Sequence, residues 1–173
     1  MNDLDEFDFK ILQQLQTDSS LSNQALADLI HVSPPTCLRR VKRLKDAGYI
    51  EREVAILSAD KLAHHTGYGL TALVEVTLDV QNAQSLDAFE QHAYSDSAVQ
   101  QCYRVSPGPD FMLVVYAADM PAYLALSQTL FAQDTNVRNA RAFFSVKCAK
   151  FTTSIPLRQT EALLIASAPL AKR

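Results

Sequence analysis

The sequence predicts an α+β fold in two parts, and three patterns in its 173 residues carry this prediction. Apolar residues recur at helical spacing in three short segments before residue 48, and the period then changes to two over residues 70–80. Helix-like and strand-like segments follow that strand and complete the order β-α-β-β-α-β. We therefore expect a helix-turn-helix domain of winged-helix type, followed by a ferredoxin-like domain with four antiparallel strands and two helices on one face.

The three expected helices of the first domain have recognisable start and stop signals. The first begins at Asp5, with acidic residues in its first turn, and the second has Ser22 as its N-cap. Ser33 is the expected N-cap of the third helix. Pro34 follows at the first helical position, where a missing N–H costs nothing because that donor has no partner inside the helix. Gly48 supplies the stop of this third helix.

The remaining elements are expected from alternation and turn signals. Residues 49–57 alternate well enough to predict a short strand, and residues 58–67 are expected to be a connector. In the second domain we expect strands over 70–80, 99–105, 110–117 and 137–151, with helices over 83–95 and 119–133. The chain thus divides into a helix-turn-helix domain (1–50), a strand and linker (51–66), a βαββαβ domain (67–157) and a C-terminal tail (158–173).

The strand over 110–117 is apolar at both alternate sets of positions, so both of its faces are suited to burial. The two helices of a ferredoxin-like domain cover only one face of the sheet. A partner sheet is the simplest cover for the other face, and it predicts that the protein forms dimers through its second domain.

Composition and charge limit the classes of protein that need to be considered. The formal net charge of −3 argues against a protein that coats nucleic acid or lipid with its whole surface, yet residues 31–45 hold five cations and no acid. The three cysteines form no C-x-x-C pattern, and the acidic N-terminus is unlike a secretory signal. We expect a cytoplasmic protein with no membrane partner, no metal and no other cofactor.

The basic third helix is the main candidate for a binding surface. Its apolar stripe of Cys37, Val41 and Leu44 should face the core, so the opposite arc should face outward. A solvated basic face is the alternative, but two preceding short helices and a tight turn favour a recognition helix that enters the major groove. The expected DNA-binding residues, on this helix or nearby, are Ser22, Ser33, Pro35, Thr36, Arg39, Lys42 and Arg43.

Specific roles follow from side-chain chemistry. Arg39 or Arg43 could bridge guanine O6 and N7, whereas Lys42 and the Ser22 hydroxyl could hold phosphates. Arg40 lies at the edge of the buried stripe, within reach of the acidic first helix. We expect Arg40 to support the domain more than it reads bases.

Two motifs in this sequence resemble those of the leucine-responsive regulatory protein and asparagine-operon regulator (Lrp/AsnC) family of transcription factors. These are L-D-x-x-D-x-x-I-L, which begins at Leu4, and S-P-x-x-C-L-x-R-V-x-R-L-x-x-x-G from Ser33 to Gly48. The resemblance covers about residues 4–157. It implies an effector domain of the RAM or ACT type, dimers that commonly gather into octamers, and an amino-acid effector bound between dimers.

The effector region of the family implies a further set of residues in this chain, beginning with the turn after the second strand. Pro107 stands where the family has glycine, and it removes a backbone N–H that could bind a carboxylate. A rigid turn that binds nothing is therefore an alternative, and Arg104 could instead bridge to a neighbouring acid. The candidate effector-binding residues are Arg104, Val105, Ser106, Gly108, Asp110, Thr135 and Asn136.

The sequence therefore predicts a sequence-specific DNA-binding transcriptional regulator that responds to an amino acid or a related small metabolite. Double-stranded operator DNA and further copies of the chain are its expected partners. Nothing resembles a catalytic triad or a pair of catalytic acids, so no enzyme activity is expected. The alternative is a small-molecule-sensing, enzyme-regulating module whose N-terminal helices bind protein.

Overall fold

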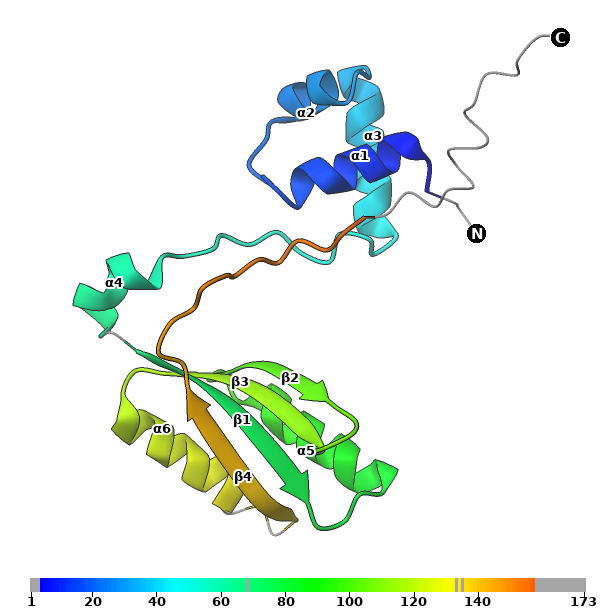
Figure 1. Cartoon of the computed structure of the whole chain (residues 1–173). Coiled ribbons are helices and arrows are strands. Elements are labelled where there is room, and N and C mark those ends of the chain that lie inside the picture. The colour runs from blue at the N-terminus through cyan, green and yellow to red at the C-terminus, as the bar shows by residue number, and fades with distance from the viewer. Residues whose placement is uncertain (1–3, 68, 133, 135, 158–173) are drawn as a thin grey trace, which may run out of the picture. The chain divides into compact units, whose positions relative to one another are not determined.

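The computed structural model describes residues 4–67, 69–132, 134 and 136–157 of the chain (Figure 1). It divides into two compact units. One runs to Ile56 and includes the segment that begins at Lys150, and the other is Leu57–Ala149. This division places residues 150–157 with the N-terminal unit, whereas the sequence-based boundary assigned them to the second domain. In the described part of the chain, no helix combines the length and the apolar character that crossing a membrane requires.

The N-terminal unit consists of α1 (Glu6–Leu15), α2 (Asn23–Leu29) and α3 (Pro34–Asp46), as the sequence predicts. Its apolar core contains Ile11 from α1, Leu26 from α2, and Cys37 and Leu44 from α3, all of which are nearly inaccessible to solvent. Burial raises the pKa of the Cys37 thiol, which agrees with its use as a small apolar residue.

The turn between α2 and α3 fixes the geometry of the helix pair. His31 adopts a left-handed conformation with φ of 58°, and its N–H donates to the Asp28 carbonyl at 3.3 Å. The N–H of Val32 donates to the Ala27 carbonyl at 3.0 Å, which completes a C-terminal motif of the kind that ends many helices. At the other end of α2, the amide of Asn23 donates to the carbonyl of Pro34 at 2.9 Å and ties the two helix starts together.

Three element predictions are corrected by the structure. No strand forms over 49–57, where Val54 and Ile56 are exposed, because an alternating sequence forms a strand only if a neighbouring strand pairs with it. The expected connector contains a helix, α4 (Ala59–Thr66), which Ser58 caps by accepting from the Lys61 N–H. The last strand also ends earlier than predicted, at Phe144.

The segment that returns from the second unit makes specific contacts with the end of α1. The side-chain amide of Gln16 donates to the carbonyl of Ile155 at 3.0 Å and accepts from the N–H of the same residue at 3.1 Å. The Ser154 hydroxyl donates to the Gln16 carbonyl at 3.2 Å. These contacts join residues that lie 138 and 139 positions apart in the chain.

The second unit is a four-stranded antiparallel sheet with helices. Its strands are β1 (Leu70–Leu78), β2 (Val99–Arg104), β3 (Phe111–Ala117) and β4 (Val137–Phe144), in the spatial order β2-β3-β1-β4. Its helices are α5 (Ala83–Ser95) and α6 (Met120–Ser127), and α6 continues into the π-helical turn η1 (Gln128–Ala132). The predicted βαββαβ fold is confirmed.

One face of this sheet is fully covered. Phe89 from α5, Tyr123 from α6 and Phe131 from η1 share a core with the strands, so both helices lie on the same face of the sheet (Figure 1). The strand residues of this core alternate along the two central strands. They are Ala72, Val74, Val76 and Leu78 of β1, and Phe111, Leu113 and Val115 of β3.

The opposite face of the sheet carries large side chains that are open to solvent. Leu73, Tyr103 and Phe143 are each about half exposed, at 43%, 53% and 45%. Across the same face, Arg141 donates to Glu75 at 2.9 Å, and its guanidinium lies 5.0 Å from the Phe143 ring centroid. These side chains do not belong to the core that the strands share with α5, α6 and η1.

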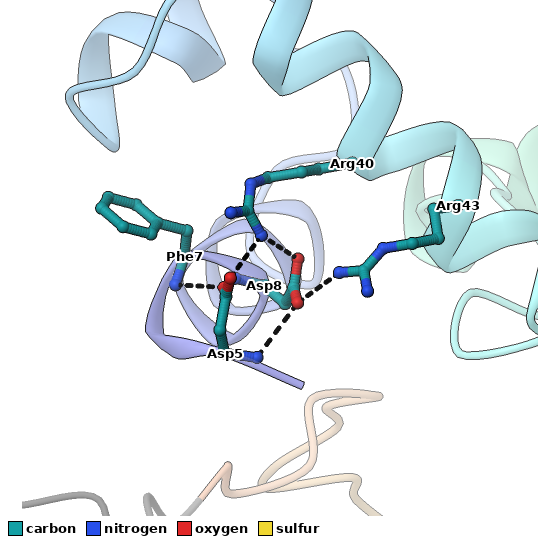
Figure 2. A network of polar contacts seen from close by, with 5 residues as sticks. All are labelled: Asp5, Phe7, Asp8, Arg40 and Arg43. Carbon is teal, nitrogen blue, oxygen red and sulfur yellow. Dashed lines mark hydrogen bonds and ion pairs between the residues drawn. The ribbon is translucent and has the colours of Figure 1, made fainter. Parts of the chain in front are cut away.

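A network of charged groups joins α1 to α3 in the N-terminal unit (Figure 2). Asp8 is fully buried, and its carboxylate accepts from Arg40 Nη1 at 2.9 Å and from Arg43 Nη2. Asp5 accepts from Arg40 Nη1 at 2.7 Å. In a reciprocal capping box, Asp5 Oδ1 accepts from the N–H of Asp8 at 3.0 Å, and Asp8 Oδ2 accepts from the N–H of Asp5 at 3.0 Å.

The network favours the ionised form of Asp8. Burial acts to raise the pKa of this carboxyl, but hydrogen bonds from Arg43, the Asp5 backbone and Arg40 outweigh it and hold the pKa below its ordinary value of 3.8. The folded state therefore binds a proton to Asp8 less readily than the unfolded state does. The resulting stability is fully present above the unfolded-state pKa and is lost as the pH falls from there through the lower folded-state pKa.

We expect Asp8→Asn to lower the free energy of unfolding by about 2 kcal/mol at pH 7, below the cost of breaking a fully buried pair, because both arginines are partly exposed. The difference from the unmutated protein should shrink as the pH falls below 3.8, where the unfolded-state carboxyl becomes protonated. Urea unfolding at a series of pH values measures this difference in the free energy of unfolding. The exposed Asp46 of α3 offers a matched control, since Asp46→Asn should change stability by less than about 0.5 kcal/mol. A difference that stays constant down to pH 2 would contradict the assignment.

Candidate functional site

The exposed face of α3 is basic, and its cations are not equivalent. Arg39 and Lys42 point away from the core and form no ion pair with any residue that the structure describes. Lys45, nearer the end of the helix, pairs with Glu53 at 3.0 Å. Arg39 and Lys42, two of the five basic side chains of this helix, therefore have all of their hydrogen-bond donors available to a ligand.

Arg40 and Arg43 are held by α1 instead. The prediction that Arg40 supports the domain agrees with its contacts to Asp5 and Asp8. Arg43, which the sequence assigned to the DNA-binding face, donates to the buried Asp8. An open concavity of about 270 Å³ lies beside these groups, lined by Asp5, Arg39, Arg40 and Arg43.

The hydroxyl residues near the helix starts already have partners. Ser22 caps α2 by accepting from the N–H of Ala25 at 3.1 Å, and its side chain remains exposed. Ser33 occupies the N-cap position of α3 as predicted, but its hydroxyl bonds the Thr36 hydroxyl at 2.8 Å and not a backbone N–H. Pro35 is exposed in the first turn of the same helix.

Leu38 is a residue of this face that the sequence analysis left unassigned. It is 60% exposed, although it follows the fully buried Cys37. A helical projection places it within one turn of Pro35 and Lys42. Its place on this face could have been predicted from the sequence, because it lies three residues after Pro35 and four before Lys42.

The candidate effector turn has few free backbone donors. Pro107 and Pro109 have no N–H, and the N–H groups at the two ends of the turn are used, from Val105 to the Asp110 carbonyl and from Asp110 to the Val76 carbonyl. Of the turn residues 105–110, Ser106 and Gly108 keep an N–H that a ligand could take. Gly108 has φ of 122°, a conformation that glycine allows.

The structure brings two parts of the candidate effector region together around residues 78–81. Asp110 Oδ2 accepts from the Leu78 N–H at 2.7 Å and from the Gln81 amide at 3.2 Å. Asn136 clamps the backbone of Val80, accepting from its N–H at 2.9 Å and donating to its carbonyl at 3.1 Å. Residues 78–81, at the end of β1, carry no motif in the sequence that would select them.

Of the other two candidates, Arg104 does not belong to this cluster. Arg104 donates to Asp87 and to Glu90 of α5, both at 2.7 Å, which is the structural role that the sequence analysis offered as its alternative. These two acids raise the pKa of the Arg104 guanidinium. Thr135 lies outside the described residues.

Two family models match the chain and divide it at the same region as the structure. Residues 4–51 match the winged helix-turn-helix DNA-binding model, and residues 71–155 match the Lrp/AsnC ligand binding domain. The first match contains α1, α2 and α3, and the second contains the four-stranded sheet except for Leu70, the first residue of β1.

Curated relatives and solved structures agree with both matches. The chain is 32% identical to the transcriptional regulator AzlB of Bacillus subtilis, over 89% of this chain and 96% of the relative. It is 33% identical to a leucine-responsive regulatory protein of Rhizobium meliloti, over 86% and 92%. The structure resembles an AsnC family regulator from Agrobacterium tumefaciens with a TM-score of 0.79 and 29% identity, over 88% and 97% of the two chains.

A transcriptional regulator from Neisseria meningitidis, solved in complex with L-Met, has a TM-score of 0.74 and 31% identity, over 89% of this chain and 97% of that chain. These similarities favour DNA binding over the alternative of an enzyme-regulating module that uses its helices to bind protein. They span both units of the chain. The chain belongs to the Lrp/AsnC family of DNA-binding transcriptional regulators.

Proposed function

We propose that this regulator reads its operator with the exposed face of α3, and that Arg39 and Lys42 are the cations that contact DNA most directly. The observation that carries this proposal is the division of the basic residues. Arg39 and Lys42 have no ionic partner among the described residues, whereas Asp8 holds Arg40 and Arg43. An arginine free of intramolecular partners can donate two hydrogen bonds to one guanine, and a free lysine can neutralise a phosphate.

The remaining residues of the predicted interface have supporting roles. Arg43 is partly exposed and lines the concavity beside Arg39, so it can add positive potential without leaving Asp8. Ser22, Ser33, Pro35 and Thr36 lie at the starts of α2 and α3, where a helix-turn-helix approaches the backbone and the groove. We assign to the chain regulation of transcription, with no catalytic step, in the cytoplasm where the chromosome lies.

The effector of the second unit is proposed to be an amino acid. The regulator from Neisseria meningitidis, which is 31% identical to this chain, was solved in complex with L-Met and supports this ligand class. In this chain, Asp110 has one carboxylate oxygen that no described group occupies, which suits an α-ammonium group. The N–H groups of Ser106 and Gly108 and the Ser106 hydroxyl suit an α-carboxylate, while Asn136 shapes the neighbouring backbone.

Assembly is proposed to begin with dimers formed through the open face of the sheet. That face exposes Leu73, Tyr103 and Phe143, side chains that a second copy of the same sheet could cover. Dimers would then gather into octamers, with the effector between dimers. An effector that prefers one arrangement of dimers over another would change which spaced half-sites the paired α3 helices reach together.

For DNA binding, we expect Arg39→Ala with Lys42→Ala to abolish specific binding and to reduce the dependence of affinity on salt, since each lost phosphate contact lowers the slope by about 0.9. Arg39→Ala alone should weaken operator binding about 5- to 150-fold. Fluorescence anisotropy with labelled duplexes, at salt concentrations from about 50 to about 200 mM, measures both the affinity and its dependence on salt. Lys61→Ala, which removes an exposed cation from α4, is the matched control and should bind as the unmutated protein does.

For the effector, we expect one or a few of the twenty amino acids to raise the melting temperature, by an amount that corresponds to about 2.7 kcal/mol at a ligand concentration of 100 Kd. Asp110→Asn should remove that shift, because the amide can still accept from the Leu78 N–H but no longer attracts an ammonium group. Asp96→Asn makes the same charge change at another carboxylate that accepts a backbone N–H, and it should keep the shift. If no amino acid moves the transition, the turn is a rigid connection that binds no such effector.

For assembly, we expect sedimentation equilibrium at micromolar concentration to give a dimer or a larger species. Leu73→Glu should shift the distribution toward monomers, because it would place a charge in the open face of the sheet, which is the proposed dimer interface. Tyr94→Glu changes an 86% exposed aromatic side chain on α5, away from the open face of the sheet, and should leave the assembly unchanged. A monomeric unmutated protein would contradict the proposal.

A further inference from the structure

We infer that the first two turns of α3 carry an apolar patch, made of Pro34, Pro35 and Leu38, which reads the 5-methyl groups of thymine bases in the major groove. The inference rests on the proposed function, because it requires α3 to be the helix that enters the groove. It adds a specificity-determining residue, Leu38, and a chemical requirement on the operator. No motif or charge in the sequence assigns this role.

The patch is contiguous on the helix surface. Leu38 is 60% exposed, Pro35 is exposed and Pro34 is half-buried. The two prolines precede Leu38 by four and three residues, and side chains at these separations are neighbours on one face of a helix. A single exposed leucine would need no explanation, but here it extends an apolar surface on a helix whose other exposed side chains are largely charged.

The same turns offer few hydrogen-bond donors to a base edge. Pro34 and Pro35 have no N–H, and the hydroxyls of Ser33 and Thr36 bond each other at 2.8 Å. The N–H of Cys37 donates to the Ser33 carbonyl at 2.9 Å. The beginning of the helix is therefore equipped for apolar contact more than for reading donors and acceptors.

In unmodified DNA, the thymine methyl is the apolar group that a base pair presents in the major groove. A recognition helix meets the base edges with its N-terminal residues, which are the residues of this patch. The cations that follow on the same surface, Arg39 and Lys42, favour a polyanion as the occupant and disfavour an apolar protein surface. Charge complementarity and the position of the patch thus point to the same ligand.

The test begins with selection of duplexes from a random pool by the full-length protein. Each thymine of the enriched operator is then replaced in turn by deoxyuridine, which lacks only the methyl group, and the Kd is measured for each duplex. We expect one or two positions per half-site at which the loss weakens binding about fourfold, the equilibrium change that corresponds to removing one buried methyl group. The Leu38→Ala variant should bind the thymine duplex and the deoxyuridine duplex almost equally when the replaced base is at one of those positions.

Two controls separate the role of Leu38 from general effects. Leu124→Ala truncates a 59% exposed leucine of α6 in the other unit, and it should retain the full preference for thymine over deoxyuridine. Leu38→Gln keeps the length and helix propensity of the side chain while removing its apolar end, and it should lose the preference without a lower melting temperature.

The outcomes distinguish this inference from the proposed function. If an operator is enriched but no thymine is sensitive to loss of its methyl group, or if Leu38→Ala keeps the unmutated preference, the thymine-reading patch is wrong and the recognition helix stands. If no sequence is enriched and all duplexes bind alike, sequence-specific reading by α3 fails, and the thymine inference falls with it.

Discussion

The buried carboxylate of Asp8 is the group on which the arrangement of the DNA-binding unit depends. Among the described residues it is the one charged side chain that solvent does not reach. Removing such a charge from water costs several kcal/mol unless strong donors replace the water. Here a backbone N–H and two guanidinium groups replace it, and the two arginines come from α3 while the carboxylate comes from α1. The interaction therefore fixes how α3 is rotated and placed against α1.

That rotation divides a run of similar cations by their contacts. Once Arg40 and Arg43 bond Asp8, the helix turns Arg39 and Lys42 outward, and Leu38 lies beside them with Pro35. A basic helix in isolation would offer all its charges to any polyanion. Packed against α1, it offers a defined pattern of cations and apolar groups, and such a pattern is what sequence discrimination requires, since charge alone binds all DNA alike.

In the second unit, too, side chains from distant parts of the chain hold one segment in place. Its four strands bury one face against α5, α6 and η1, and the backbone segment at the end of β1 is held from two sides by Asp110 and Asn136. Two covalent connections join this unit to the DNA-binding unit, because the chain passes between them near residues 56 and 149. After the second connection, Ile155 bonds Gln16 at the end of α1, so two separate stretches of the chain contribute to the unit that binds DNA.

The local features of the fold were predictable from the sequence because their causes are local. Asp5 and Ser22 cap α1 and α2 through hydrogen bonds within three residues, Pro34 begins α3, and alternation over β1 marks its buried face correctly. The predicted strand over 49–57 was wrong for the complementary reason. A strand needs a partner ladder, and nothing within a short window of sequence reveals whether a partner exists.

By itself, the sequence determined that three helices precede a βαββαβ unit and that the third helix is basic. Only the tertiary structure decided which of its arginines remain available. Arg39, Arg40 and Arg43 have the same chemistry and lie within two turns of one helix, so composition and spacing place them only approximately. Their roles separate because Asp8, 32 residues from Arg40 and 35 from Arg43 along the chain, is buried within hydrogen-bonding distance of two of them and not of the third. The free energy of that buried ion pair depends on packing across the whole unit, which no local pattern encodes.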